Sequence, residues 1–243
     1  SVMFADIRDF TSLSEQMTPE ENFHFINAFL SRMEPTIAEH QGFIDKYIGD
    51  AIMALFSQGQ GADDALRASV AMLERLQSYN TEREANERPP IAIGSGINTG
   101  RLMLGTVGGQ NRMDGTVISD TVNVAARIER LTRVYGVNLL ISHHTFMQLD
   151  DANQYAMRVI DRVRMKGKSN FVSVYEVFEP DPPLLKAAKL ATKTQFETAL
   201  LLYFQEAYED AAAQLQRCLA DCPGDEIATI YLHRCRTKMM QER

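Results

Sequence analysis

Two aspartates stand where a carboxylate can bind a metal ion. Asp6 follows the short apolar run Val2–Ala5, and Asp50 stands in a Gly-Asp pair between two apolar runs. Carboxylates at strand ends and hairpin turns can converge, and with phosphate oxygens they suit Mg²⁺, so the pair predicts a metal site for phosphoryl or nucleotidyl transfer. Taken singly, each has a simpler explanation, since Asp6 could cap a helix and Asp50 could be a turn former.

The residues after Asp6 predict a place for phosphate. A short helix is expected to start at Phe10 and Thr11, with Ser12 and Glu15 spaced as a capping box. The start of a helix offers free N–H groups and a positive partial charge, which favour a phosphate group beside the metal. No Walker A sequence is present, so the common NTPase fold is excluded as the way to hold a triphosphate.

Three basic or amide side chains are further candidates. Asn123 and Arg127 stand four residues apart on one expected helix, so their side chains point to the same surface. On spacing alone, Arg127 with Arg130 would more often form an exposed basic face. Lys46 alone would be a solvated residue of a strand.

The elements that must position these residues alternate between strands and helices. Strands are expected over residues 2–5, 43–48, 51–56, 91–98, 102–107, 137–141, 157–165 and 172–177, and helices over 62–84, 120–134 and 143–149. A further helix begins at Thr18 with Pro19 and Glu21 in a capping box, and its expected core stripe is Phe23, Ile26, Leu30, Met33 and Ile37. Adjacent hairpins with helices predict an α+β fold, one sheet covered by helices.

A domain boundary is expected at the proline-rich segment Glu179–Pro183. We therefore expect a first domain over residues 1–180 and a helical extension over 184–243, with helices at 195–207, 208–222 and 226–240. Small, bulky and terminating residues in this extension resemble one tetratricopeptide-type (TPR-like) helical pair. It would either cap the first domain or serve as a docking or dimer-spacing element.

Composition excludes several classes of protein. The 243 residues carry a formal net charge of −7, which argues against a broad basic surface for nucleic acid. No apolar run approaches the roughly 18 residues of a membrane helix, and no signal segment opens the chain. The three cysteines, Cys218, Cys222 and Cys235, are expected to be buried free thiols. These features favour a cytoplasmic fragment of a larger protein.

Three segments together resemble the catalytic domain of the class III nucleotidyl cyclases. They are FADIRDFT at 4–11, DKYIGD at 45–50 and TVISDTVNVAAR at 116–127, and the resemblance covers residues 1–177. It implies a ferredoxin-like, palm-like α+β core whose active sites form between two catalytic domains packed head to tail. Ser119 is a departure, since many relatives carry glycine there.

The resemblance also implies a role for each candidate. Asp6, Asp50 and the backbone carbonyl of Ile7 would bind two Mg²⁺ ions per site, for which Mn²⁺ can substitute. Lys46 and Thr116 would read the purine, Asn123 would orient the ribose, and Arg127 would neutralise charge at the α-phosphate. Lys166 would contact the terminal phosphates, and Phe10 and Thr11 would also bind the substrate.

The function implied is that of an adenylyl cyclase, a lyase converting ATP to 3′,5′-cyclic AMP and pyrophosphate in a homodimer. Lysine with threonine, rather than glutamate with cysteine, matches the adenine-selecting version, because Lys46 can donate to adenine N1. Two alternatives are a guanylyl cyclase and a non-catalytic cyclase-like module for regulation or dimerisation. A third is a protein-interaction scaffold built on the C-terminal helices. The family is commonly fused to sensory domains, so an upstream sensory domain is expected.

Overall fold

The computed structural model describes residues 1–57, 59–109, 112–164 and 171–241, and the chain divides into two compact units. The first unit comprises Ser1–Arg133 and Asn138–Ala152, and the second comprises Val134–Val137 and Asn153–Arg243. Strands and helices are mixed along the chain, so the expected α+β class is confirmed. The domain boundary at residue 180 and the TPR-like character of the extension stay predictions.

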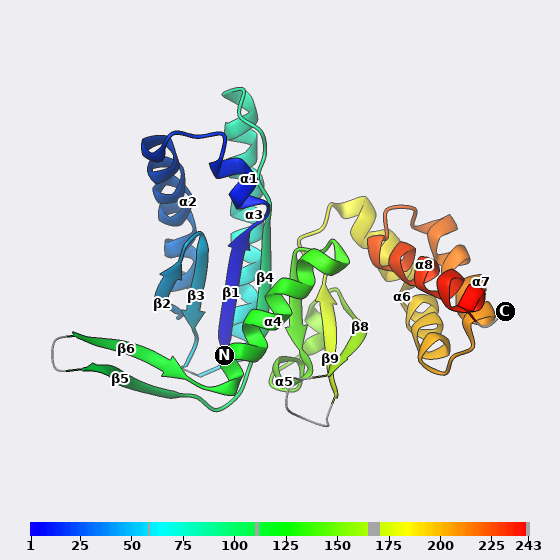
Figure 1. The fold of residues 1–243 in the computed structure, drawn as a ribbon. Coiled ribbons are helices and arrows are strands. Elements are labelled where there is room, and N and C mark those ends of the chain that lie inside the picture. Colours follow the sequence, from blue (N-terminus) through cyan, green and yellow to red (C-terminus); the bar gives the residue numbers. More distant parts are fainter. Residues whose placement is uncertain (58, 110–111, 165–170, 242–243) are drawn as a thin grey trace. The chain divides into compact units, whose positions relative to one another are not determined.

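The first unit is built on strands in the order β2-β3-β1-β4-β7. The central strand β1 (Val2–Ile7) runs antiparallel to both β3 (Ala51–Leu55) and β4 (Ile93–Asn98) (Figure 1). The hairpin expected around Asp50 is present, because β2 (Phe43–Ile48) pairs antiparallel with β3. On the other side β4 pairs in parallel with β7 (Leu139–Ser142).

The two faces of this sheet are covered by different helices. Met3 faces α3 (Gly61–Ala85), where the Ser69 hydroxyl lies 3.0 Å from its sulfur. On the opposite face Val2 and Phe4 belong to a core that includes Ala125 of α4 (Asp120–Tyr135). Because side chains alternate along a strand, Asp6 shares this second face with α4.

Helix α2 (Pro19–Glu39) begins as expected but buries a different stripe. The Thr18 hydroxyl accepts from the Glu21 N–H at 3.2 Å, and the Glu21 carboxylate accepts from the Thr18 N–H at 2.7 Å, so the capping box is confirmed. The expected core position of Phe23 is wrong, since 72% of this side chain is exposed. The buried residues are Phe25, Phe29, Met33, Thr36 and Ile37. The helix packs along an i, i+4 row that starts two residues later, and Ile26 and Leu30 border it.

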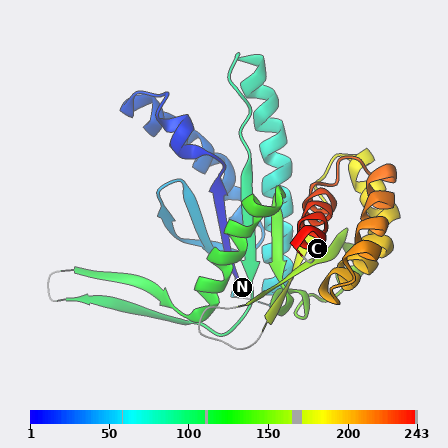
Figure 2. The same ribbon diagram turned by 45° about the vertical axis from the view of Figure 1, so that its right-hand side comes forward.

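A separate two-stranded arm extends from the first unit (Figure 2). It consists of β5 (Met103–Gly109) and β6 (Arg112–Ile118), paired antiparallel from Met103↔Ile118 onward. Two short helices complete the unit, α1 (Phe10–Ser14) and α5 (His143–Phe146).

The second unit combines a hairpin with three helices. The hairpin is β8 (Met157–Arg164) with β9 (Phe171–Val177), and a bulge falls between Val159 and Asp161. The helices are α6 (Pro183–Phe204), α7 (Tyr208–Asp221) and α8 (Glu226–Gln241). Helix α6 begins twelve residues before the expected start at 195, because Pro183 opens the helix instead of separating it from the hairpin. All three cysteines are buried and free, as expected.

Buried charges join these helices to the hairpin. The Arg158 guanidinium donates to both oxygens of Asp225 at 2.6 and 2.7 Å and to Glu176 at 2.7 Å. Lys189 of α6 donates to Glu176 at 2.7 Å and to Asp181 at 2.6 Å. Burial alone would lower the pKa of Arg158, but the Glu176 and Asp225 carboxylates outweigh it and raise that pKa. The network therefore fixes α6 and the start of α8 onto the hairpin.

None of the helices in the described part of the chain has both the length and the apolar character needed to cross a bilayer.

Candidate active site

Asp6 lies at the carboxyl end of β1, beside a glycine of β4. It stands opposite Gly94 and is partly exposed. A Cβ atom on Gly94 would come within 2.2 Å of the Thr132 hydroxyl and 3.3 Å of a Glu129 carboxylate oxygen. Glycine at this position therefore lets α4 pack closely against the sheet next to Asp6.

Asp50 reaches the same place from the β2–β3 turn. The preceding Gly49 has φ +66°, a left-handed conformation that glycine adopts without strain. The Asp50 carboxyl is hydrogen bonded to Asp6, and its Oδ2 atom is buried without a hydrogen-bond partner in the described structure. Burial first, and then Asp6, raise the pKa of Asp50 to about 7, although backbone bonds from Asp50 and Ile7 oppose part of the rise. The two candidate metal ligands are thus brought together.

This pair fits a site for hard divalent cations. A buried carboxylate oxygen without a partner is costly, and a bound cation would satisfy it. Among the described residues no cluster of three or more His, Cys, Asp or Glu side chains could hold a metal. The protein would therefore supply only the two carboxylates and a backbone carbonyl such as that of Ile7. Mg²⁺ in nucleotide sites is commonly bound in this way, with phosphate oxygens and water filling the other positions.

Helix α1 starts where expected, but its cap differs. Phe10 is the first helical residue, and Asp9 before it has φ +52° and makes no side-chain cap. The expected capping box of Ser12 and Glu15 is wrong, because the helix has already begun at Phe10. The Phe10 ring stacks on Phe25 of α2 with centroids 6.3 Å apart, which anchors this short helix and leaves Thr11 exposed.

Lys46 lies at the bulge in β2. The register between β2 and β3 shifts between Ile44 and Lys46. The Lys46 ammonium lies 3.2 Å from Oδ2 of Asp45, an ion pair without hydrogen-bond geometry, and its side chain is about one third exposed. The side chain is therefore held near the sheet edge while part of it stays accessible.

Two of the other candidates have side chains outside the described residues. Thr116 is placed by its backbone in β6, opposite Gly105 of β5, so it lies on the arm. Lys166 falls within 165–170, outside the described residues. The predicted roles of both stay predictions.

Asn123 and Arg127 lie on the outer face of α4, as their spacing predicts. Both are exposed, whereas Ala125 and Ile128 between and beside them are fully buried. On the inner side, a Cβ atom on Gly96 would meet the Glu129 backbone nitrogen at 2.1 Å. Among the described residues no contact joins Asn123 or Arg127 to the Asp6–Asp50 pair. A second copy of the chain could supply these side chains to the pair.

Sequence reasoning missed Glu129. It lies on the inner face of α4, is only 9% exposed, and interacts electrostatically with Asp6. Burial first, and then Asp6, raise its pKa to about 7, while Arg133 and Arg8 act in the opposite direction. The available signal was its position in the stripe Ala125, Ile128, Glu129 and Thr132, where a core helix places buried residues.

The hydrogen bonds of Ser119 account for serine at a position where many relatives carry glycine. Its hydroxyl donates to the Arg101 carbonyl at 2.8 Å and accepts from the Thr121 N–H at 3.1 Å. Serine therefore caps the amino end of α4 and ties it to the start of the arm.

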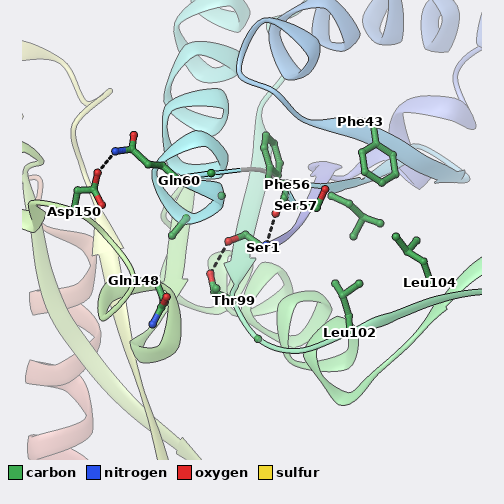
Figure 3. Close-up of a pocket in the computed structure, with 15 residues that line it drawn as sticks. Ser1, Phe43, Phe56, Ser57, Gln60, Thr99, Leu102, Leu104, Gln148 and Asp150 are labelled. Carbon is green, nitrogen blue, oxygen red and sulfur yellow. Dashed lines mark hydrogen bonds between the residues drawn. The ribbon is translucent and has the colours of Figure 1, made fainter.

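A cavity of about 460 Å³ lies at the other end of β1 (Figure 3). Its lining includes Phe43, Leu102, Leu104 and Gln148. The five strand residues to Asp6 correspond to about 17 Å, so the cavity is separate from the carboxylate pair. None of the candidate catalytic residues lines it.

Comparison with known proteins places these features in a family. The model of the adenylate and guanylate cyclase catalytic domain matches residues 1–177. This match covers most of the chain, and the chain belongs to the class III cyclase catalytic domain family. The adenylate cyclase of Anabaena cylindrica is 47% identical over 182 residues, which is 73% of this chain and 36% of that protein. The chain thus spans about a third of that relative's length.

Solved structures agree in fold. The adenylyl cyclase CyaB from P. aeruginosa is 33% identical with a TM-score of 0.65, covering 72% of this chain and 91% of that one. The guanylyl cyclase Cya2 is 30% identical with a TM-score of 0.64, covering 75% of this chain and 92% of that one. The two similarities are nearly equal, so the choice between purines depends on individual residues.

Proposed function

We propose that this chain is an adenylyl cyclase catalytic domain that converts ATP to 3′,5′-cyclic AMP and pyrophosphate. The observation that carries the proposal is the Asp6–Asp50 carboxyl pair, with its buried oxygen lacking a partner. Such a pair at the end of a central strand suits a triphosphate bound through Mg²⁺ or Mn²⁺. ATP is a cytoplasmic nucleotide, so a cytoplasmic location is part of the proposal.

The candidate residues divide the work of binding. Lys46 would donate to adenine N1, and Thr116 would bond the purine edge. Phe10, Thr11 and Lys166 would hold the phosphates, the first two through free N–H groups at the start of α1. Asp6, Asp50 and the Ile7 carbonyl would hold two divalent ions, which would supply activation of the ribose 3′-hydroxyl and neutralisation of the triphosphate.

The reaction exchanges one phosphorus–oxygen bond for another. The O3′–Pα bond forms while the bond from Pα to the oxygen bridging to the β-phosphate breaks, and pyrophosphate leaves. Asn123 would orient the ribose for in-line attack, and Arg127 would stabilise the negative charge that develops on the α-phosphate. The 3′-hydroxyl proton would leave to water or to a phosphate oxygen.

The active site would form between two copies packed head to tail. Asp6 and Asp50 of one copy would act with Lys46, Thr116, Asn123, Arg127 and Lys166 of the other, so a two-fold dimer has two equivalent sites. Exposed apolar side chains on β2 and β5 support an interface there: Phe43, Tyr47, Ile48, Met103 and Leu104. An upstream sensory domain in the whole protein belongs to the same proposal.

Product identification after incubation with ATP or GTP, each with Mg²⁺ and with Mn²⁺, tests the proposal. We expect cyclic AMP from ATP, and a loss of at least about 10²-fold in kcat for Arg127→Ala. Arg130→Ala, which removes an exposed arginine from the same helix, is the matched control and should stay near wild type. A preference for GTP would favour the guanylyl cyclase alternative, and no cyclic product would favour a non-catalytic module.

A further inference from the structure

The last two residues of α4, Val134 and Tyr135, belong to the second compact unit, although its first turns carry Asn123 and Arg127. Tyr135 ends the helix and is only 1% exposed. Its hydroxyl donates to the Asp161 carboxylate of β8. Burial and this hydrogen bond raise the pKa of Tyr135 to about 12, so the hydroxyl keeps its proton at neutral pH.

Arg234 of α8 also contacts Tyr135, through both its ring and its hydroxyl. Its guanidinium lies 5.3 Å from the Tyr135 ring centre and 4.8 Å from that of Tyr231, and it donates to the Tyr135 hydroxyl at 3.4 Å. The two rings are stacked at 6.5 Å. A cation at the carboxyl end of a helix is also favoured by the helix dipole.

Helix α8 is itself fixed in the second unit. The Tyr231 hydroxyl donates to the Ile160 carbonyl of β8 at 2.8 Å. Asp225 accepts from the Ala228 N–H at 3.2 Å, which caps α8, while it also binds Arg158. A shift of α8 would break these buried hydrogen bonds. The helix that carries Arg234 is therefore held in place where Arg234 contacts Tyr135.

Helix α4 connects this contact to the candidate catalytic residues. Eight residues separate Arg127 from Tyr135, which is about 12 Å along a helix. No glycine or proline interrupts these residues, and the first glycine is Gly136, at φ +65° just after the helix. The segment therefore moves as one rigid rod, and holding its last turn restricts the rotation of its first turns.

We propose that the C-terminal helices hold α4 in its catalytic orientation, with Arg234 and Tyr135 as positioning residues. The C-terminal extension is then a working part of the catalytic domain, distinct from a detached spacer. This inference rests on the proposed function, because it assigns Asn123 and Arg127 of α4 to the reaction.

Two measurements on the full chain test it: steady-state kinetics with ATP, and hydrogen exchange of the α4 amides. We expect Arg234→Ala to lower kcat about tenfold with the KM for ATP within about twofold, and to speed exchange in α4 about tenfold. Tyr135→Phe keeps the buried ring and removes the hydroxyl, so it should show a smaller change of the same kind. Arg236→Ala, an exposed arginine on the same helix, is the control.

Faster exchange confined to α4 and the second unit, together with the fall in kcat, would support the proposal. Exchange in α4 equal to that of Arg236→Ala would overturn it, and so would equal loss of protection in β1 and β4, which would mean general destabilisation. A wild-type chain without cyclase activity would refute the proposed function, and the exchange comparison would still decide whether α8 restrains α4.

Discussion

At the scale of single residues, Asp50 combines its proposed role as a metal ligand with a cost in stability. Its carboxylate is half-buried, lies beside a second carboxylate and leaves one oxygen without a partner. The folded protein therefore favours the neutral form, and its pKa rises from 3.8 to about 7. Without a divalent ion, stability falls as the pH rises from about 4 to about 7 and the carboxylate becomes charged.

The first prediction follows from this fall in stability with rising pH. Asp50→Asn should abolish activity yet raise the free energy of unfolding of the metal-free protein at pH 8. The gain should be on the order of 1 kcal/mol, well below the full electrostatic cost because solvent screens a half-exposed group. Thermal unfolding in a chelator at pH 8 and at pH 4 measures it.

Asp9→Asn is the matched control, since Asp9 is an exposed carboxylate between β1 and α1 and asparagine tolerates its left-handed backbone. We expect the stabilisation by Asp50→Asn to vanish near pH 4. A destabilised Asp50→Asn variant at pH 8 would contradict the proposed repulsion between the carboxylates.

The sequence was informative about single residues where a local rule or a motif applied. The capping box of Thr18 and Glu21 follows from local spacing and is present. The meeting of Asp6 with Asp50 was anticipated from strand ends and from the motifs together. Glu129 was missed because its interaction with Asp6 depends on how α4 packs on β4, a tertiary contact that spacing alone does not show.

At the scale of elements, the contact between α4 and β4 depends on two glycines. Gly94 and Gly96 face the helix, and a Cβ atom on Gly96 would overlap Glu129 backbone at 2.1 to 2.5 Å. Backbone atoms cannot rotate away as a side chain can, so α4 would have to move. The position of Arg127 on α4 therefore depends on β4 having no side chains at Gly94 and Gly96.

The second prediction is that Gly96→Ala costs about 2 kcal/mol of stability and lowers kcat by at least about tenfold. Chemical denaturation and initial rates measure the two effects. Gly105→Ala is the control for stability, because nothing lies within 4 Å of a Cβ atom at that position in the arm. Equal free energies of unfolding for the two variants would show that α4 does not pack against Gly96 as described.

The buried charge network is the second feature at this scale. Arg158 and Asp225 have fully buried side chains and pair through two hydrogen bonds. Removing one partner leaves the other charge buried without compensation, which typically costs about 3–5 kcal/mol.

The third prediction is therefore that Asp225→Asn strongly destabilises the second unit, by about 3 kcal/mol. Limited proteolysis with mapping of the cut sites should show α6–α8 becoming accessible first. Asp210→Asn, an exposed carboxylate in the first turn of α7, should cost less than about 1 kcal/mol. Unchanged resistance of Asp225→Asn to protease would contradict the role of this network.

Element types were predicted better than element faces and ends. In α2, apolar residues follow two overlapping rows, one from Phe23 and one from Phe25, so two stripes fit the sequence and only packing selects the one through Phe25 and Phe29. Proline at 183 was interpreted as a break, but at the first turn of a helix its missing N–H costs nothing, and α6 starts there.

At the scale of the whole molecule, the central claim is that one chain contains every catalytic group and yet needs a second copy. Asp6 and Asp50 pair on the sheet, while Asn123 and Arg127 point outward from α4. In a two-fold dimer each site would take its carboxylates from one copy and its arginine from the other.

Mixing two inactive variants measures this most directly. Asp50→Asn and Arg127→Ala should each be inactive alone. In an equal mixture half of the dimers pair one variant with the other, and each mixed dimer has one intact site of two, so we predict about a quarter of wild-type activity. Differently tagged chains, captured in turn on both tags, verify that mixed dimers form. Captured mixed dimers that make no cyclic AMP would contradict a site shared between two copies.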